Sequence, residues 1–324
     1  MNSYTPTPRS PNVTPTGAEA RERAAEFESS APMTPTATTA LDDRPSRDDV
    51  TYNSTMPSPG RRIGRYLVIE QIGAGGMGVV FSAYDDVLDR RVALKLVLDR
   101  RRGDATWYAR TLREAQALAR LSHPNVVQIY EAGEYADEIY LAMEFIKGCT
   151  LRELLKQRAR ARGGGPPRRD ELPAILDLFQ QAGHGLAAAH GSGLVHRDFK
   201  PANVLVDEAG RARVADFGLV AATATATTEA TQGGDDTRQR HRADALGIEL
   251  TREGAVMGTL AYMSPEQLSG QSADAQSDQF SFCVALHEAL HGARPFAGED
   301  YASLRANVPL GIRAAAPANR AVPA

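Results

Sequence analysis

Four polar residues in the middle of the sequence have the types and spacing needed to move a phosphoryl group. Asp198 and Lys200 lie in the run HRDFKPAN at residues 196–203, Asn203 ends that run, and Asp216 begins the run DFG. A carboxylate can accept and orient a substrate hydroxyl, a lysine can neutralise developing charge, and amide and carboxylate oxygens bind Mg2+. We therefore predict a catalytic base at Asp198, charge stabilisation by Lys200, and Mg2+ ligands in Asn203 and Asp216. Caps and turns are the alternative for such loop residues.

A glycine-rich loop lies upstream at residues 73–78. Its glycines let the backbone approach a ligand and present amide groups without a side chain in the way. A dinucleotide-binding loop would lead into a helix, whereas Val79 to Phe81 is strand-like. We therefore expect a hairpin lid over phosphates; a flexible turn is the alternative for the motif by itself.

Lys95 and Glu114 are expected to form an ion pair that aims the lysine at the phosphates of ATP. Lys95 ends the apolar run VALK in a predicted strand, and Glu114 lies on a predicted helix. Either residue by itself is more typical of a solvated surface charge. Their joint spacing with the glycine-rich loop favours the pair.

Short runs of β-forming residues predict an antiparallel sheet in the first half of the chain. The expected strands are Tyr66–Ile69, Val79–Phe81, Arg91–Leu96, Val126–Tyr130 and Ile139–Phe145. Apolar residues at helical spacing predict one helix from Trp107 to Leu121, which a proline turn ends.

Helices are expected to dominate after Gly148, over Leu151–Arg158, Leu172–His190 and Gln279–His291. The fold class is therefore α+β, with a β-rich lobe at residues 61–147 and a helical lobe at 148–324. Residues 1–60 are rich in Pro, Thr and Ser without an apolar period, so they are expected to form a disordered tail.

Composition excludes several classes of protein. The 324 residues carry a formal net charge of -3, so no overall positive field argues for nucleic acid or an anionic membrane as partner. Cys149 and Cys283 are far apart, which favours neither a disulfide framework nor a zinc site. We find no apolar run long enough to span a membrane and no signal peptide. A reduced, cytoplasmic setting is the expectation.

Taken in order, the glycine-rich loop, VALK, HRDFKPAN and DFG resemble the signature set of the eukaryotic-type Ser/Thr protein kinases found in bacteria. The resemblance covers residues 66–296. It implies a two-lobed protein-kinase fold, ATP and Mg2+ as cofactors, and a protein substrate with Ser or Thr acceptors. Thr259 fits the same class, because its hydroxyl would bridge Asp198 and Lys200.

The resemblance also implies which residues enclose ATP. Those that would cover the phosphates are Gly73, Gly75, Gly76 and Gly78. Those that would surround the adenine are Ile72, Val80, Ala93, Met143 as gatekeeper, the hinge residues Glu144 and Ile146, and Leu205. A stacked column of Leu118, Ile129, His196 and Phe217 would be anchored by Asp278; ordinary core packing describes its apolar members equally well.

Regulation by phosphorylation is a further implication of the resemblance. A buried Arg197 beside the catalytic aspartate needs an anion, which a phosphothreonine of the activation segment would supply. Thr251 is the first candidate for autophosphorylation. The segment contains an unusually long, threonine-rich insert at about 221–250, which is expected to be disordered and is otherwise a plain linker.

The chain departs from the family pattern after Phe296. Further helices, one with an arginine that pairs with the glutamate at the Glu266 position, are expected in the family, so the helical lobe should be incomplete and Glu266 should lack its partner. Arg313 and Arg320 are replacements by elimination only. An inactive kinase-like nucleotide-binding or interaction module is therefore the alternative to an active kinase. A small-molecule phosphotransferase is disfavoured by residues 258–266. The sequence leaves the oligomeric state open.

Overall fold

The computed structural model describes residues 56–75, 78–98, 105–136, 138–217, 257–298, 300–314 and 321–322. Most of the predicted N-terminal tail, the predicted insert at 221–250, Gly76, Thr251 and Arg320 lie outside the described residues. The expectations for them, and the predicted lobe boundaries, stay predictions.

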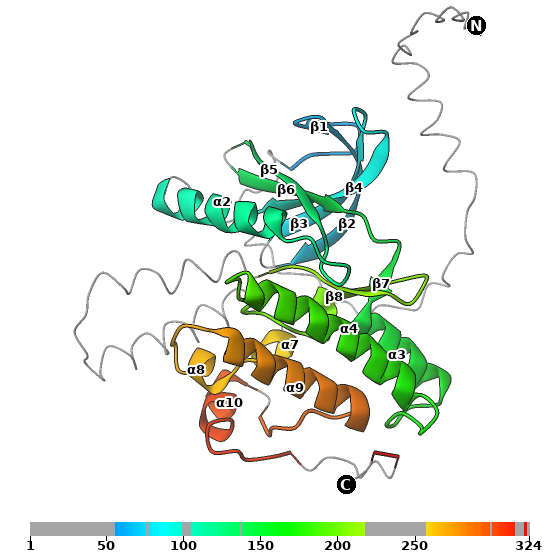
Figure 1. Ribbon diagram of the computed structural model, residues 1–324. Helices are drawn as coiled ribbons and strands as arrows, with labels where there is room; N and C mark the ends of the chain where they lie inside the picture. The colour runs from blue at the N-terminus through cyan, green and yellow to red at the C-terminus, as the bar shows by residue number, and fades with distance from the viewer. Residues whose placement is uncertain are drawn as a thin grey trace, which may run out of the picture. The chain divides into compact units, whose positions relative to one another are not determined.

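The first lobe is a six-stranded antiparallel sheet with strand order β1-β2-β3-β4-β6-β5, and helix α2 packs on β5 and β6 (Figure 1). The elements are β1 (Arg62–Ile63), β2 (Tyr66–Gly75), β3 (Gly78–Asp85), β4 (Arg90–Val97), α2 (Ala105–Arg120), β5 (Ile129–Tyr135) and β6 (Glu138–Glu144). The predicted antiparallel sheet and its helix are confirmed.

One predicted strand begins later than expected. Residues 126 and 127 do not join β5, because their backbone pairs with the other lobe: Val127 N donates to Val214 O at 2.9 Å, and Val214 N donates to Asn125 O at 2.8 Å. Gln128 stays with the first lobe, since its backbone oxygen accepts from Glu144 N at 2.9 Å. The bonds with Val214 join the first lobe to the segment that leads to Asp216. The connection between lobes therefore lies directly beside the predicted metal ligand.

The second lobe is helical and carries a small three-stranded sheet beneath the first lobe. Its elements are β7 (Gly148–Thr150), α3 (Leu151–Ala161), α4 (Leu172–Gly191), the 3-10 turn η2 (Pro201–Asn203), β8 (Val204–Asp207), β9 (Ala212–Val214), α7 (Met257–Leu260), α8 (Pro265–Leu268), α9 (Ala275–His291) and α10 (Tyr301–Asn307). The three predicted helices are confirmed. Helix α9 starts four residues earlier than predicted because Asp274 caps it, accepting from the backbone N–H groups of Gln276 and Ser277.

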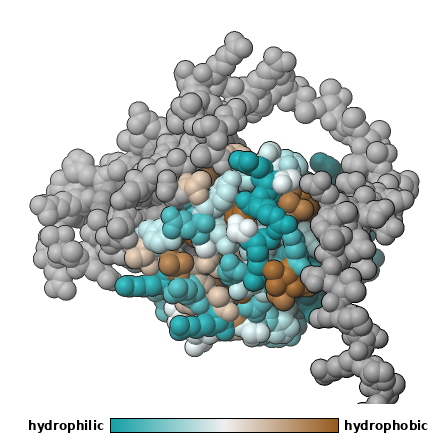
Figure 2. Space-filling view, turned by 90° about the horizontal axis from the view of Figure 1, so that it is seen from above, coloured by the Kyte–Doolittle hydropathy of each residue, from teal (hydrophilic) through white to brown (hydrophobic). Residues whose placement is uncertain are grey.

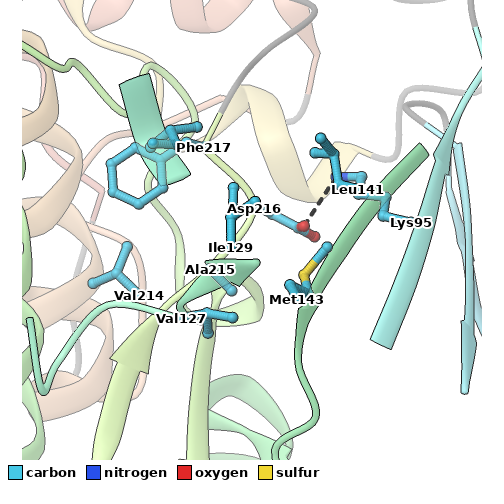
Figure 3. A pocket seen from close by; sticks show the side chains of 10 residues that line it. Lys95, Val127, Ile129, Leu141, Met143, Val214, Ala215, Asp216 and Phe217 are labelled. Atoms are coloured by element: carbon cyan, nitrogen blue, oxygen red, sulfur yellow. Dashed lines mark hydrogen bonds and ion pairs between the residues drawn. The ribbon is translucent and has the colours of Figure 1, made fainter. Parts of the chain in front are cut away.

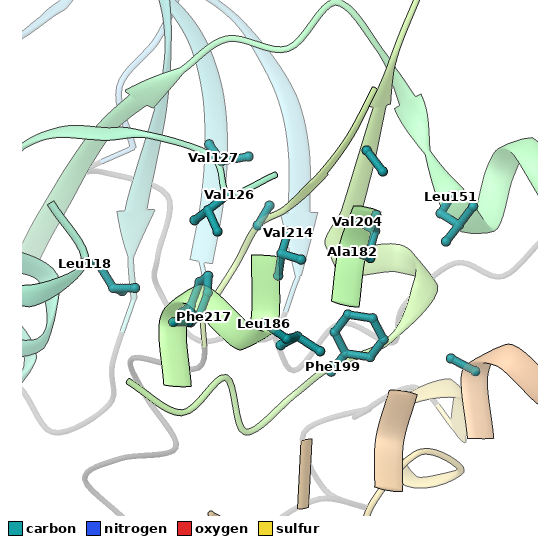
Figure 4. Packing of buried hydrophobic residues seen from close by; sticks show 14 of the residues in the cluster. Leu118, Val126, Val127, Leu151, Ala182, Leu186, Phe199, Val204, Val214 and Phe217 are labelled. Carbon is teal, nitrogen blue, oxygen red and sulfur yellow. The ribbon is translucent and has the colours of Figure 1, made fainter. Parts of the chain in front are cut away.

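One hydrophobic core runs through both lobes, and Figure 4 shows its members converging from α2, α4 and the strands around Val214. The Phe199 ring contacts Phe282 at 5.6 Å between centroids, and Phe282 contacts Phe179 of α4 at 5.5 Å. The loop at residues 196–203, called the catalytic loop below because it holds the predicted base, is thus packed onto buried helices. The face in Figure 2 is largely hydrophilic where it is not grey, with hydrophobic residues in separate patches.

Glu266 has a partner other than the expected arginine. Its carboxylate accepts a hydrogen bond from the hydroxyl of Ser277, which is buried in α9. Within the described part of the chain, Glu266 forms no ion pair with an arginine, and Arg313 instead forms a backbone bridge with Phe296. A hydroxyl thus satisfies one carboxylate oxygen at the α8–α9 junction.

Gly78 is required by the close approach of β3 to β4. Its φ is 139°, and a Cβ at this position would lie 2.1 Å from the backbone oxygen of Leu96. We expect Gly78→Ala to lower the free energy of unfolding by about 2 kcal/mol, because the backbone must shift and a strained φ is imposed. Thermal melting measures this. Gly75→Ala is the matched control, since a Cβ there meets nothing within 4 Å; equal losses in both variants would contradict the explanation.

Candidate active site

The predicted catalytic residues meet where the two lobes face each other. Lys95 of β4 is 7% exposed, and its Nζ lies 2.9 Å from Oδ1 of Asp216, a contact drawn in Figure 3. Asp216 follows β9 with a φ of 56°, a left-handed conformation that is uncommon for a residue with a side chain. The carboxylate is thereby turned toward the β-rich lobe.

Asp198, Lys200 and Thr259 form a continuous polar chain. Lys200 Nζ lies 2.7 Å from Asp198 Oδ2 and donates to Thr259 Oγ1 at 3.0 Å. Lys200 therefore contacts both Asp198 and Thr259, whereas Thr259 had been expected to bridge Asp198 and Lys200. Asn203 Nδ2 donates to the backbone oxygen of Asp198 at 2.8 Å and to Oδ2 at 3.2 Å. The structure thus brings Asp198, Lys200, Asn203 and Thr259 together.

Asp278 of α9 holds the catalytic loop from beneath. Its carboxylate is 1% exposed and accepts from the backbone N–H of His196 and of Arg197, both at 2.7 Å. His190 Nε2 lies 2.8 Å from the same carboxylate. Because Arg197 has a φ of 66°, these bonds stabilise a backbone turn that is costly by itself. The predicted anchoring by Asp278 fits this geometry.

His196 is fully buried under the catalytic loop. Burial lowers its pKa, although Asp278 and Asp198 oppose this. Nε2 lies 3.0 Å from the backbone oxygen of Ala215, and Nδ1 accepts from the backbone N–H of Asp198 at 3.3 Å. This set of partners fits a neutral ring protonated at Nε2. The ring contacts Phe217 at 4.7 Å, as the predicted column requires.

The buried histidine predicts a loss of stability in mild acid. Below pH 6.5 the unfolded chain binds a proton that folded His196 resists, so the free energy of unfolding falls with pH until the lowered pKa is reached, by up to about 1.4 kcal/mol per pH unit. Denaturant melts from pH 7.5 to 5 measure this. His196→Phe should flatten the profile. His184→Gln, at an exposed site, should not. His291 contributes in the same direction in all three proteins. A profile unchanged in His196→Phe would refute the explanation.

The predicted Lys95–Glu114 pair is not formed. Glu114 of α2 instead pairs with Arg197, and Lys95 pairs with Asp216. Burial raises the pKa of the Glu114 carboxyl, and the charge and hydrogen bond of Arg197 oppose it. Each of these four charges therefore has a partner of opposite charge in its part-buried position, although the pairs differ from the one expected.

Most of the residues predicted around the adenine belong to, or pack against, the hydrophobic core that runs through both lobes. Ala93 faces Met143 across the β4–β6 ladder, and Val80 faces Lys95 across β3–β4. Ile146 and Leu205 pack on the same core, while Ile72 near the β2 tip is 47% exposed.

A cavity lies between Met143, the predicted gatekeeper, and Phe217 (Figure 3). It is lined by Lys95, Leu118, Val127, Ile129, Leu141, Met143, Val214, Ala215, Asp216 and Phe217. Four of these lining residues were not predicted from the sequence: Val127, Leu141, Val214 and Ala215. Their residue types and neighbours in the sequence are those of ordinary buried apolar residues, so nothing marks them as lining a cavity. Most of the predicted adenine residues do not line this cavity.

Arg213 is a second residue that the sequence reasoning missed. Its side chain is 10% exposed, with Nη1 2.8 Å from Asp207 Oδ2 and Nε 3.6 Å from Glu144 Oε2. It thus ties the predicted hinge to the β8–β9 strands. The sequence around Arg213 does not indicate this role, since a single arginine in an apolar run is usually interpreted as a surface charge.

Asn203 and Asp216 fit the ligands that Mg2+ requires. Asn203 donates through Nδ2, which leaves its Oδ1 as an acceptor, and it is joined to the Asp216 segment by a 2.8 Å bond from Ala215 N to its backbone oxygen. Burial would raise the pKa of Asp216, but the charge and hydrogen bond of Lys95, together with the charge of Lys200, lower it below its usual value. An ionised carboxylate beside an amide oxygen is a hard-oxygen donor pair.

Comparison with known proteins agrees with this geometry. The family model described as the protein kinase domain matches residues 66–312. The serine/threonine-protein kinase PknL of Mycobacterium tuberculosis is 39% identical over 250 residues, which cover 76% of this chain and 55% of PknL. PrkC of Bacillus subtilis is 36% identical over 246 residues, 76% of this chain and 33% of PrkC. The chain thus spans about half, or less, of these relatives.

Solved structures give the same fold. The kinase domain of Mycobacterium tuberculosis PknI superimposes with a TM-score of 0.55 at 23% sequence identity, over 76% of this chain and 81% of that domain. The two-lobed α+β architecture is therefore confirmed. From the family match and the bacterial relatives, the chain belongs to the eukaryotic-type serine/threonine protein kinases of bacteria.

Proposed function

We propose that this chain is an ATP-dependent protein kinase that transfers the γ-phosphate of ATP to Ser or Thr hydroxyls of proteins. The observation that carries the proposal is the chain of contacts from Thr259 through Lys200 to Asp198, beside Asn203 and Asp216. This arrangement brings together a base, a cation and two oxygen ligands from the loops before β8 and after β9. Phosphoryl transfer uses these groups to orient the acceptor and to stabilise the charge of the transition state.

The adenine would bind under Val80 and Ala93 and above Leu205, with the backbone of residues 144–146 at its edge. The glycine-rich hairpin would cover the phosphates, and Lys95 would contact them. Mg2+, bound by Asn203 and Asp216, would neutralise phosphate charge.

Asp198 carries the acceptor's side of the reaction. It accepts the proton of the Ser or Thr hydroxyl as that oxygen bonds to the γ-phosphorus and the bond to the ADP oxygen breaks. Lys200 stabilises the charge on the moving phosphoryl group, and Thr259 orients Lys200.

Activation-segment phosphorylation is proposed as the control of this site. Lys95 Nζ contacts Oδ1 of Asp216, and its move to Glu114, the carboxylate predicted to pair with it, would free both oxygens of Asp216 for the metal. Glu114 is held by Arg197, whose guanidinium a phosphothreonine would bind more strongly than a carboxylate does. Autophosphorylation at Thr251 would then release Glu114 to Lys95.

A transfer assay tests the proposal. The purified chain is incubated with γ-labelled ATP and a generic protein substrate, with Mg2+ or with a chelator in its place. Labelled phosphoserine or phosphothreonine, formed only with Mg2+, is the expected result. Asp216→Asn, which lacks the metal-binding charge, is the control for contaminating kinases. Label equal in this variant and the parent, or label on tyrosine only, would overturn the proposal.

The alternative of an inactive binding module is not favoured, because the residues proposed for base, charge stabilisation and metal binding are present, with Asp198 in contact with Lys200 and Asn203, and Asp216 in contact with Lys95. In the described part of the chain, none of the helices is long and apolar enough to cross a bilayer. A cytoplasmic location, where ATP is available, is part of the proposal.

A further inference from the structure

The outward face of α3 is strongly basic. Residues 147–169 contain eight Lys or Arg side chains and one acidic side chain, in a chain whose formal net charge is -3. Arg152, Lys156 and Arg160 recur at intervals of four, so they lie along one face, and all three are exposed. Leu151, which starts the helix, is fully buried.

The three side chains along this basic face are left unpaired by the described part of the fold. Arg152, Lys156 and Arg160 form no ion pair with any of the residues that the structure describes. The one acidic residue on the helix, Glu153, is engaged at its start, where its carboxylate accepts from the backbone N–H of Thr150 at 2.9 Å. The basic face is therefore available to a partner.

The basic face begins beside the place where an acceptor hydroxyl must bind. Arg152 lies close enough to Tyr262 for its charge to act on the phenol, and Tyr262 N donates to Thr259 O at 3.2 Å. Thr259 in turn reaches Asp198 through Lys200. In addition, α3 packs against η2, the second half of the catalytic loop.

The acidic side chain that contacts Tyr262 already has partners of its own. Glu288 of α9 accepts a hydrogen bond from the Tyr262 hydroxyl, and Arg294 Nε lies 3.6 Å from Glu288 Oε1. Arg294 also lies over the Tyr262 ring, 5.9 Å from its centroid. Because Glu288 is paired with Arg294, it offers no free carboxylate to an acceptor with basic flanking residues.

We propose that Arg152, Lys156 and Arg160 select acceptor proteins in which acidic residues flank the Ser or Thr that receives the phosphate. This inference rests on the proposed kinase function. The three side chains span about 12 Å along α3, because eight residues rise about 1.5 Å each. An extended peptide covers that length with roughly four residues, so a run of about four acidic side chains matches the basic face.

The test uses synthetic peptides with one threonine and a four-residue flank of glutamate, glutamine or lysine, placed before or after the threonine. We expect kcat/KM for the better glutamate peptide to exceed that for glutamine at least fivefold, and the lysine peptides to be worst. The advantage should shrink as salt rises, because exposed charges are screened. Arg152→Glu/Lys156→Glu should remove the preference while keeping activity on the glutamine peptide and the KM for ATP.

Arg61→Glu/Arg120→Glu is the matched control, since it makes the same charge change at exposed arginines of the β-rich lobe. It should keep the preference for glutamate. Equal kcat/KM for all flanks, or the same preference after both double substitutions, would overturn the inference but leave the kinase function standing. Absence of transfer to every peptide and to the chain itself would overturn both.

Discussion

Asp198→Asn is expected to reduce the rate of phosphoryl transfer about 100- to 10,000-fold, while nucleotide affinity stays within about twofold of the parent. The asparagine can keep an oxygen toward Lys200 Nζ and Asn203 Nδ2, which lie 2.7 and 3.2 Å from Asp198 Oδ2, so the loop need not rearrange. It cannot accept the proton of the acceptor hydroxyl. Single-turnover transfer and fluorescent-nucleotide titration measure the two quantities separately.

A matched substitution controls for the loss of one negative charge. Asp177 is exposed on α4, and its carboxylate accepts from Gln181 Nε2 at 2.9 Å. Asp177→Asn should leave both transfer and binding unchanged. If Asp198→Asn transferred phosphate at more than about a tenth of the parent's rate, the assignment of Asp198 as the base would be wrong.

The sequence was a good guide where chemistry is local. Asp198, Lys200 and Asn203 lie within a stretch of six residues, so a short loop places their side chains near one another. The glycine-rich hairpin is recognisable from the strands that flank it. The same holds for the helices, whose apolar spacing is regular. The confirmed fold class follows from these local patterns.

The sequence was a poor guide where partners are distant and charges can exchange. Lys95 can reach a carboxylate on α2 or one after β9, and only the position of α2 decides between them. Arg213 illustrates the same difficulty, since its ion pair with Glu144, a predicted hinge residue, joins the three-stranded sheet to the six-stranded sheet. Ser277 as partner of Glu266 was also unforeseeable, because a hydroxyl carries no charge to suggest the pairing.

Asp278→Asn is expected to lower the free energy of unfolding by about 3 to 5 kcal/mol, the largest stability effect of any substitution considered. A carboxylate can accept the backbone N–H groups of His196 and Arg197 and the bond from His190 together, whereas an amide has one accepting oxygen and adds a donor. At least one buried N–H then lacks a partner, and a charged acceptor is lost. Chemical denaturation measures the change.

Asp274→Asn, four residues earlier on the same helix, separates this effect from a general weakening of α9. Asp274 is exposed and caps the helix by accepting from Gln276 N at 2.8 Å and Ser277 N at 3.0 Å. Asparagine caps nearly as well as aspartate, so this variant should lose less than about 1 kcal/mol. If the two variants unfolded alike, Asp278 would be an ordinary helix residue. Because Asp278 fixes the backbone just before Asp198, its substitution should also reduce transfer at temperatures where the variant is still folded.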